Sequence, residues 1–458
     1  MYLSTFYGGK YMLNRGILKK LIGTFLGVTL VVTSIAFPTK VKAMESSTGY
    51  FRALSSNVAG LPSIISSGNP SENSVAMGEY FNDYDLVSVQ EDFAYHSELT
   101  SKITLPYATE TSGNVPFGDG MNLFSNYPLY ETTRIKWNDS YGIITNGADQ
   151  MTPKGILYSS IEIADGYFID VYDIHTDADT DDGSMAARES NLKQLAEYIN
   201  NRSAGKAVIV IGDTNCRYTR DKIAESVLDP CGLTDVWVEY MRDGVAPEYG
   251  ADALMDSENR NSANNEVVDK IWYRSGSNID LQATYYELKE DFVDEDGECL
   301  SDHYPITATF QYTLKETMLT SETYGGGGGT GFSFIEDMNY RFPDTIGIST
   351  GTRLDRVEFI YEDTVCSAGG TGGTYQSLDL ADGEYIEKME VCKAKKTWSG
   401  TYRISYIKFT TNLGNTLECG TLGSTVYTFE APDGYAIAGL HGMADDEVDR
   451  IGAVYMLK

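Results

Sequence analysis

The sequence feature that most constrains the fold is an apolar run, residues 208–211, followed by Gly212, Asp213, Thr214 and Asn215. Its four β-branched residues predict a buried strand, with the polar residues in the loop at the carboxyl end of that strand. α/β enzymes place ligands and catalytic groups at this edge of a sheet. Residues 300–306 repeat the arrangement, with Asp302 beside His303. We expect the two stretches to form opposite walls of one active site.

Other predicted strands also deliver oxygen or imidazole side chains at or near their ends. These residues are Asn57, Glu91, His175 and Asp269. Between the strands, residues 186–200 carry apolar side chains at helical spacing. Mixed strands and helices, with polar groups at the strand ends, predict an α/β sandwich whose active site lies on one side.

The strand-end residues have the chemistry of a metal-dependent hydrolase. An imidazole suits proton transfer near neutral pH, and Asp269 beside His303 would fix its tautomer. Oxygen ligands suit a magnesium-class ion, and four residues offer them: Asn57, Glu91, Asp213 and Asp302. The set predicts metal-assisted attack of water on a phosphoester. Taken singly, such residues are commonly turns, helix caps or solvated acids, so the hypothesis depends on their repetition. His96, although near Glu91, and His441 are expected to be structural.

The N-terminus predicts export. Arg15, Lys19 and Lys20 precede an uncharged apolar run at 21–37, and Ala43 provides a small residue for cleavage. This order is typical of a signal peptide spanning residues 1–43 and predicts a secreted protein, with an uncleaved membrane anchor as the alternative. The start codon is Met1 or Met12.

Charge and cysteine content narrow the possible partners. The formal net charge is −31, which argues against a broad grip on phosphate backbones, because such binding needs Lys and Arg to displace counterions. Six cysteines in an exported chain permit disulfides. None of them has metal-ligand spacing, so we expect no zinc site.

At 458 residues the chain is too long for one core, and its composition changes near residue 320. Glycine runs at 325–329 and 369–373 punctuate short alternating strands, and no convincing helix follows residue 324. We predict a first domain at 44–313, a polar linker at 314–321, and an all-β domain at 322–458.

The order of motifs resembles that of the endonuclease/exonuclease/phosphatase superfamily over residues 51–312. The matching segments are Ser-Asn57-Val-Ala-Gly-Leu-Pro, Val-Gln-Glu91-Asp, Tyr-Asp-Ile-His175-Thr-Asp-Ala, Gly212-Asp213-Thr214-Asn215, Val-Asp269-Lys-Ile and Ser301-Asp302-His303-Tyr304-Pro305. The resemblance implies an α/β four-layer sandwich that binds a divalent cation, Mg²⁺ or else Mn²⁺ or Ca²⁺. It implies Glu91 as the chief metal ligand, with Asn57 and Asp302 nearby.

The same resemblance implies catalytic roles. His303, oriented by Asp269, would activate or stabilise across the phosphate, and His175 would be the second imidazole. Asp213 and Asn215 would place the attacking water and hold a phosphoryl oxygen. Glu131 and Arg134 are further candidates, whose alignment is loose.

The C-terminal segment resembles the jacalin-related lectins over residues 322–458. The resemblance lies in both glycine runs, in Leu380-Ala-Asp-Gly-Glu-Tyr-Ile386 and in Gly439-Leu-His-Gly442 with Val448-Asp-Arg-Ile-Gly452. It implies a β-prism whose sugar site lies between the first glycine loop and the loop before the last strand. The residues at these positions are Gly326, Asp446, Glu447 and Asp449. That last loop lacks the aromatic often found there, and a prism that only packs on its neighbour is the alternative.

These observations predict a secreted, divalent-metal-dependent phosphodiesterase that acts on a phospholipid of the sphingomyelin type and binds glycans through its C-terminal domain. One alternative is a secreted nuclease acting on extracellular DNA or RNA. Another is a carbohydrate-binding adhesin with an inactive first domain. No partner protein is predicted.

Overall fold

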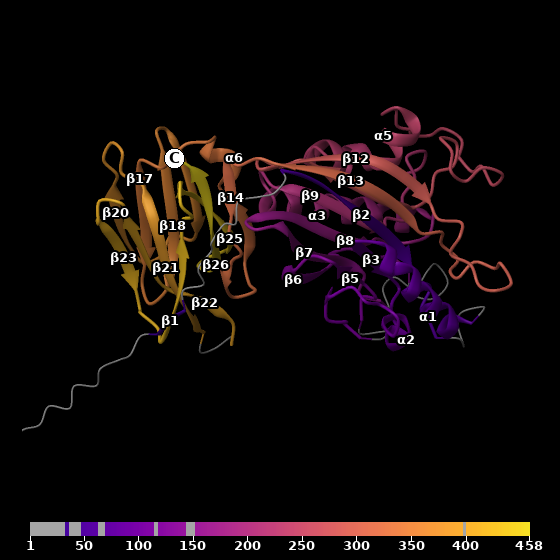
Figure 1. Cartoon of the computed structure of the whole chain (residues 1–458), viewed down its shortest axis with the longest axis horizontal. Coiled ribbons are helices and arrows are strands. Elements are labelled where there is room, and N and C mark those ends of the chain that lie inside the picture. Colours follow the sequence, from indigo (N-terminus) through magenta and orange to yellow (C-terminus); the bar gives the residue numbers. More distant parts are fainter. Residues whose placement is uncertain (1–32, 36–46, 63–68, 114–117, 143–151, 397–399) are drawn as a thin grey trace, which may run out of the picture.

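The computed structural model describes residues 33–35, 47–62, 69–113, 118–142, 152–396 and 400–458. The chain forms an α/β lobe followed by a β lobe (Figure 1). The predicted signal segment lies outside the described residues except for β1 (Thr33–Ile35), which pairs in parallel with β24 (Thr425–Glu430). Within the described ranges, no helix is long and apolar enough to span a membrane.

Two six-stranded sheets form the centre of the α/β lobe. The first contains, in spatial order, β12 (Ile279–Leu288), β13 (Ile306–Leu314), β2 (Thr48–Asn57), β3 (Leu86–Gln90), β5 (Asn122–Ser125) and β4 (Tyr107–Ala108). The second contains β10 (Thr234–Asp235), β11 (Asp269–Arg274), β9 (Ala207–Asp213), β8 (Tyr167–His175), β7 (Gly155–Ala164) and β6 (Leu129–Lys136). The sheets pack face to face, since β2 and β3 contact β8 and β9.

Helices cover both outer faces of this pair of sheets. α3 (Asp182–Arg202) buries its apolar face against the core of the second sheet. α1 (Pro70–Tyr80) and α2 (His96–Thr100) cover the first sheet through a separate cluster that includes Met77 and Leu99. The order helix, sheet, sheet, helix confirms the predicted four-layer sandwich. Shorter helical segments are η1 (Phe81–Asp83), the π-helix η3 (Ala224–Leu228), α4 (Asp229–Cys231) and α5 (Val236–Arg242).

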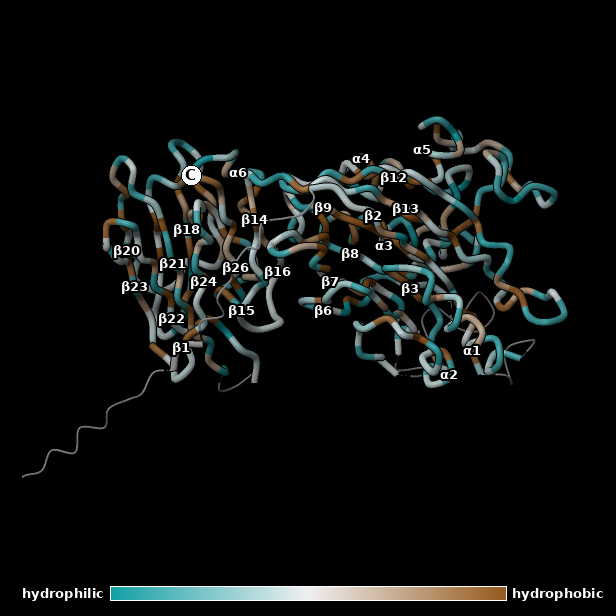
Figure 2. Tube along the Cα trace, in the orientation of Figure 1, coloured by the Kyte–Doolittle hydropathy of each residue, from teal (hydrophilic) through white to brown (hydrophobic). Residues whose placement is uncertain are grey.

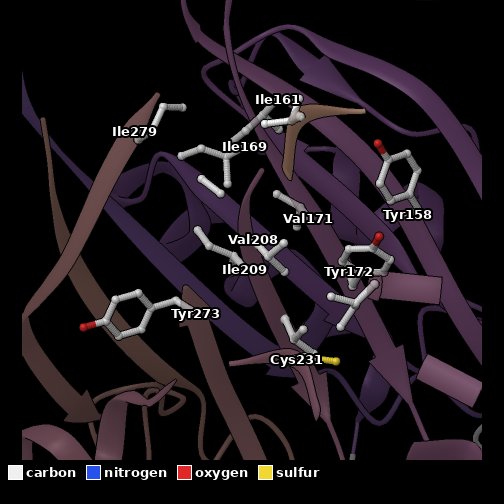
Figure 3. Close-up of a cluster of buried hydrophobic side chains, with 14 of the residues drawn as sticks. Tyr158, Ile161, Ile169, Val171, Tyr172, Val208, Ile209, Cys231, Tyr273 and Ile279 are labelled. Atoms are coloured by element: carbon white, nitrogen blue, oxygen red, sulfur yellow. The ribbon is translucent and has the colours of Figure 1, made fainter. Parts of the chain in front are cut away.

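The central strands are apolar on both faces. All seven residues of β9 are buried, as its β-branched run predicts. Figure 3 shows Val208 and Ile209 of this strand beside Ile169 and Val171 of β8 in the core. Figure 2 shows apolar strands inside both lobes and polar loops around them. All six cysteines are free, four of them buried.

Strand register brings predicted site residues to one edge of the second sheet. The parallel strands β8 and β9 pair His175 with Asp213, and the antiparallel strand β11 pairs Asp269 with Asp213. Gly212 permits this approach, because it has a φ of +145° and a Cβ there would lie 2.1 Å from the carbonyl oxygen of Ile174. Three predicted site residues from separate strands therefore lie side by side.

The β lobe is a prism with three faces. One face contains β17 (Thr345–Thr350), β18 (Leu354–Tyr361), β19 (Thr364–Gly369) and β20 (Thr374–Asp379). The second contains β21 (Ile386–Lys395), β22 (Tyr402–Thr411), β23 (Thr416–Gly420) and β24. The third contains β14 (Met318–Thr320), β15 (Tyr324–Gly325), β16 (Thr330–Ser333), β25 (Tyr435–Ala444) and β26 (Val448–Leu457). This architecture confirms the predicted β-prism, although one short helix, α6 (Ile335–Met338), occurs where no helix was predicted.

The two lobes are in direct contact. The segment predicted as a linker, residues 314–321, contains β14, whose residues Met318 and Leu319 are buried and pair with β26. α3 of the α/β lobe contacts β16 and β25 of the β lobe. Ser333 donates a hydrogen bond to the carbonyl oxygen of Ala204 across the boundary (2.8 Å). The prism is thus docked on the α/β lobe by packed side chains.

Candidate active site

Asp213 is the centre of the candidate site. Its Oδ2 lies 3.4 Å from Nε2 of His175 and 3.9 Å from Nε2 of His303. Nδ1 of His303 lies 2.8 Å from Oδ2 of Asp269. His175 and Asp213 are buried, whereas the side chain of His303 is 21% exposed. One carboxylate therefore faces both imidazoles, and the more exposed imidazole has a second carboxylate behind it.

Asn57 joins the first sheet to this cluster. It lies at the end of β2, which runs parallel to β3 and pairs Asn57 with Gln90, so that Glu91 follows at the same edge. The Nδ2 of Asn57 donates to Glu91 Oε1 and to Asp213 Oδ2, both at 3.2 Å. The carbonyl oxygen of Asn57 accepts from Ser301 Oγ at 2.7 Å. Loops from both sheets thus meet around one amide.

Two of the site residues have left-handed backbone conformations, Glu91 at φ +60° and Asn215 at φ +48°. Such conformations are costly for residues other than glycine and cluster at functional sites. The backbone N–H of Asn215 donates to Asp213 Oδ1 at 2.9 Å, and its Nδ2 donates to the carbonyl oxygen of Thr176 at 3.3 Å. Asn215 is therefore held against the strand ends that carry His175 and Asp213.

The structure brings together seven of the eight predicted residues of the first domain. These are Asn57, Glu91, His175, Asp213, Asn215, Asp269 and His303. Asp302 is next to His303 in the chain but is exposed. Its side chain accepts only from Ser301 Oγ, at 3.4 Å, among the hydrogen bonds seen in the described residues.

Burial and mutual charge set the protonation of this cluster. Burial lowers the pKa of His303, but the Asp269 and Asp213 carboxylates outweigh it and raise that pKa to about 11. Burial likewise raises the pKa of Asp213, yet His303 and the hydrogen bond from His175 hold it well below its usual range. Burial raises the pKa of Asp269. In the cluster as it stands, a protonated His303 lies between two acids.

The donor atoms fit a divalent cation. Carboxylate oxygens of Asp213 and Asp269 and a ring nitrogen of His303 lie within 4.8 Å of one another, and with His303 protonated the two carboxylates are the ligand atoms. Two buried atoms, Oδ1 of Asp269 and Nδ1 of His175, have no hydrogen-bond partner within the described part of the chain. The carboxylate of Glu91, at the rim, adds the hard oxygen that Mg²⁺ prefers.

Asn57 differs in orientation from its predicted use as a metal ligand. Its Oδ1 accepts from the backbone N–H of Ala59 at 3.0 Å, and its N–H groups point to the two carboxylates. In this structure the amide therefore orients Glu91 and Asp213. The residues whose donor atoms lie within 4.8 Å of one another are Asp213, Asp269 and His303. They differ from the predicted metal ligands, which are Asn57, Glu91 and Asp302.

Several residues that support the site were missed at the sequence level. Trp137 Nε1 donates to the carbonyl oxygen of His175 at 2.7 Å, and Lys154 Nζ donates to that of Thr176 at 3.3 Å. Asp173, two residues before His175 on the same strand, is buried, and burial raises its pKa well above the usual value. The two-residue period of a strand is a signal that could have identified Asp173.

The further candidates and the remaining histidines lie outside this cluster. Arg134 NH1 pairs with Asp119 at 2.5 Å, and Glu131 pairs with Arg202 at the lobe boundary. His96 Nδ1 lies 2.5 Å from Asp92 Oδ2, five residues from Glu91. His441 is buried in the β lobe, with Nε2 3.0 Å from the carbonyl oxygen of Ser321.

The predicted sugar-site residues of the β lobe are mutually close but paired with cations. The backbone N–H of Gly326 donates to the carbonyl oxygen of Asp449 at 2.7 Å. The Asp449 carboxylate is buried and forms an ion pair with Arg403. Burial raises the pKa of Asp449 to about 6 even though Arg403 lowers it.

The other two acids of the predicted sugar site differ in exposure. Asp446 is exposed. Glu447 is largely buried among three cations, Arg353 at 2.5 Å, Lys396 at 3.3 Å and Arg403 at 3.4 Å. Glu447 and Asp449 are therefore both already paired with cationic side chains.

A glycine loop packs against an aspartate, as Gly326 packs against Asp449, a second time on the face formed by β17 to β20. Gly370 N–H donates to the carbonyl oxygen of Asp355 at 2.9 Å, as Gly326 does to Asp449. A Cβ on Gly373 would lie 2.5 Å from Asp355 Oδ2, and one on Gly329 would lie 2.7 Å from Asp449 Oδ2.

The face that contains β22 has the same backbone contact without the acid. There Thr421 N–H donates to the carbonyl oxygen of Ser405 at 2.6 Å. Asp355 is half-buried, and no ion pair to it occurs in the described residues. Sequence reasoning missed Asp355, although the second glycine run, residues 369–373, was the signal for it.

Comparisons with known proteins divide the chain in the same way. Residues 72–236 match the model of the endonuclease/exonuclease/phosphatase family 2, and residues 321–454 match that of the jacalin-like lectin domain. A sphingomyelinase of Mycobacterium tuberculosis is 34% identical over 302 residues, which cover 64% of this chain and 58% of that protein. The chain thus matches somewhat more than half the length of this curated relative.

Solved structures are similar to each lobe. Beta toxin from Staphylococcus aureus is 18% identical with a TM-score of 0.40, covering 56% of this chain and 99% of that one. A Malaysian banana lectin is 27% identical with a TM-score of 0.26, covering 31% of this chain and 99% of that one.

Proposed function

Because the chain joins an endonuclease/exonuclease/phosphatase domain to a jacalin-like lectin domain, we propose that it is a divalent-metal-dependent phosphodiesterase acting on a phospholipid of the sphingomyelin type. The observation that carries the proposal is the contact of Asp213 with Asn57, His175 and His303 at one edge of the paired sheets. The identity to a mycobacterial sphingomyelinase supports the choice of substrate class.

In this proposal, the chain's own residues bind the phosphate and handle the proton. Asp213 and Asn215 hold the attacking water and a phosphoryl oxygen. His303, kept protonated by Asp269 and Asp213, stabilises negative charge on the phosphoryl group. His175, whose Nε2 faces the same oxygen of Asp213 as His303 does, would exchange a proton with water or with the leaving oxygen.

Glu91 would hold the cation, with Asn57 and Asp302 as the other predicted ligands. Bound there, a Mg²⁺, Mn²⁺ or Ca²⁺ ion would supply positive charge to the phosphoryl oxygens.

For the lectin domain we propose glycan binding that holds the enzyme on a glycosylated surface. Tethering raises the effective concentration of substrate without altering the active site. The Asp355 loop supports this role, because among the described residues no cation pairs with its carboxylate, whereas Asp449 is paired with Arg403. Secretion belongs to the same proposal. It predicts that protein recovered from the medium begins at Met44.

A panel assay tests the proposal. Purified protein with Mg²⁺ is given sphingomyelin vesicles, duplex DNA and a generic phosphodiester, with EDTA as the control. Choline phosphate release from sphingomyelin that EDTA abolishes is the expected result. Cleavage of DNA alone would favour the nuclease, although the net charge of −31 opposes it. Silence on all three substrates with glycan binding retained would favour the adhesin.

A further inference from the structure

Charged side chains join two loops that follow strands ending in site residues. One loop follows β8 and contains residues 176–181; the other follows β9 and contains residues 214–222. Arg188 of α3 lies between them, with only 1% of its side chain exposed. A buried charge is retained only where its partners are well placed.

Arg188 binds both loops at once. Its NH1 donates to the carbonyl oxygens of Asp177 at 2.9 Å, Ala178 at 3.1 Å and Asp179 at 2.9 Å. Its Nε donates to Asp221 Oδ1 at 2.9 Å. The loop after His175 is thus tied by three consecutive carbonyls to an acid of the other loop.

Asp221 continues the connection toward Asn215. Its Oδ2 accepts from the backbone N–H of Arg217 and from Nε of Arg220, both at 2.9 Å. Arg220 also donates from NH2 to the carbonyl oxygen of Asn215. An unbroken path of charge-assisted hydrogen bonds therefore runs from Asn215 through Arg220, Asp221 and Arg188 to the loop that follows His175.

A solvent-reachable cavity of about 240 Å³ lies against this path. Its lining includes Arg188, Arg220 and Asp221 together with Met185 and Tyr249. A small planar cation can therefore reach the space that a truncated arginine would leave.

We propose that Arg188, Asp221 and Arg220 are positioning residues that set the spacing between His175 and the Asp213–Asn215 loop. The inference rests on the proposed hydrolase function. Hydrolysis needs the water-holding groups and the imidazoles aligned within a fraction of an ångström, and a displacement of about 1 Å costs roughly a hundredfold in rate. The bridge acts on the reaction through the two loops, since none of its three side chains contacts Asp213 or His303 in the hydrogen bonds and ion pairs of the described residues.

The test compares Arg188→Ala and Arg220→Ala with Arg242→Ala. Arg242 is a matched control, because its guanidinium also donates to backbone carbonyls, those of Val245 and Ala263, but away from the site. We expect kcat on sphingomyelin to fall about 10- to 100-fold in the two bridge variants, with KM little changed, and to stay near wild type in the control. Guanidinium or ethylguanidinium should restore part of kcat in the bridge variants, saturably, and leave the control unaffected.

A second measurement separates this inference from the proposed function. The chain has four histidines, so imidazole nitrogen NMR resolves His175 individually whether or not the protein is active. We expect the His175 signals to shift in Arg220→Ala and to return with guanidinium, while those of His441 in the β lobe stay fixed. Wild-type inactivity on all phosphodiesters would refute the function, leaving the NMR result to decide the bridge. Two results would contradict the positioning role of Arg188, Asp221 and Arg220. One is a wild-type kcat in the folded bridge variants, and the other is a loss of kcat with shifted His175 signals that guanidinium does not reverse.

Discussion

The guanidinium of Arg202, in the last turn of α3, lies 2.9 Å from the carboxylate of Glu131 where the two lobes meet, and the side chains are only 4% and 10% exposed. The same guanidinium lies 3.8 Å from the centre of the Tyr158 ring. Glu131 also accepts from Thr323 Oγ1 of the β lobe at 2.5 Å. Both members of this ion pair belong to the α/β lobe, but the carboxylate of Glu131 also accepts a hydrogen bond from the β lobe. Docking of the lobes and stability of the chain are therefore linked.

Removing one member of this pair should destabilise the whole chain. Glu131→Gln leaves Arg202 buried without its counter-charge, and we expect a loss of about 3 kcal/mol in the free energy of unfolding. Urea denaturation followed by circular dichroism measures it. The control is Glu189→Gln, which breaks the exposed pair with Lys193 and should change stability by less than about 0.5 kcal/mol. An equal loss in the free energy of unfolding in both variants would contradict a special contribution of the Glu131–Arg202 pair to stability.

Acid should weaken the same boundary. Burial raises the pKa of Glu131, but Arg202, Lys206, His441 and the Thr323 hydroxyl outweigh it and lower that pKa from 4.5 to about 2. Burial, with Lys206, lowers the pKa of His441 from 6.5 to about 3. Both folded-state pKa values lie below the unfolded ones, so the stability from each group is complete above its unfolded pKa and is lost as the pH falls to the folded value.

The expected result is a free energy of unfolding that declines from about pH 6.5 downward, by roughly 5 kcal/mol for His441 and roughly 3 kcal/mol for Glu131. Glu131→Gln should remove the Glu131 part between pH 4.5 and 2. The His441 part should remain and extend to lower pH, because the Glu131 charge raises the pKa of His441. If the free energy of unfolding of that variant falls with pH as it does in the wild type, Glu131 does not cause the acid destabilisation. Equilibrium denaturation at a series of pH values makes the measurement.

The imidazole held by two acids should be needed for turnover. His303→Ala should lower kcat about 10²- to 10⁴-fold, because the charge next to Asp213 is removed. Asp269→Asn, which keeps the shape but loses the partner of Nδ1, should lower kcat less. Initial rates on sphingomyelin vesicles measure both, with glycan binding and circular dichroism as checks of folding. A near-normal rate in His303→Ala would contradict the assignment of His303 as a catalytic residue.

Activity should depend on a divalent cation through Glu91. EDTA should abolish turnover and added Mg²⁺ restore it. Glu91→Gln should raise the Mg²⁺ concentration for half-maximal activity by at least about tenfold, because a charged oxygen ligand is lost. Glu72→Gln, on the exposed face of α1, is the matched control and should titrate like wild type. Identical titrations for the two variants would place the ion elsewhere.

Glycan binding should depend on Asp355 more than on Asp449. Arg403 already occupies the Asp449 carboxylate, whereas Asp355 is half-buried and paired with no cation in the described residues. Asp355→Ala should abolish the glycan-array signal, and Asp449→Ala should leave most of it. The sequence resemblance predicts the reverse for Asp449, so loss of signal only in Asp449→Ala would restore the first glycine loop as the sugar site.

Much of the site could be predicted because its residues follow local rules. A β-branched run ends in a polar loop whatever surrounds it, and the parallel order of strands places such loops at one edge. This is why Asp213, Asn215 and His175 can be predicted from the sequence. Asp269 opens the antiparallel strand β11 and reaches the same edge through its register with Asp213. Asn57 is also predicted, as a metal ligand, and that role stays a prediction. The direction of its amide depends on Glu91 and Asp213, which come from two different strands.

The sequence by itself determined the two folds, the motif order and the acidic, glycine-rich character of the chain, because these depend on residue periodicity and composition. Only the tertiary structure decided which side chains share a contact: Arg403 with Asp449, Arg188 with Asp221, and Arg202 with Glu131. The members of each pair are 33 to 71 residues apart. Their distance is fixed by sheet register and by packing between layers, and neither is written in the local pattern around either residue.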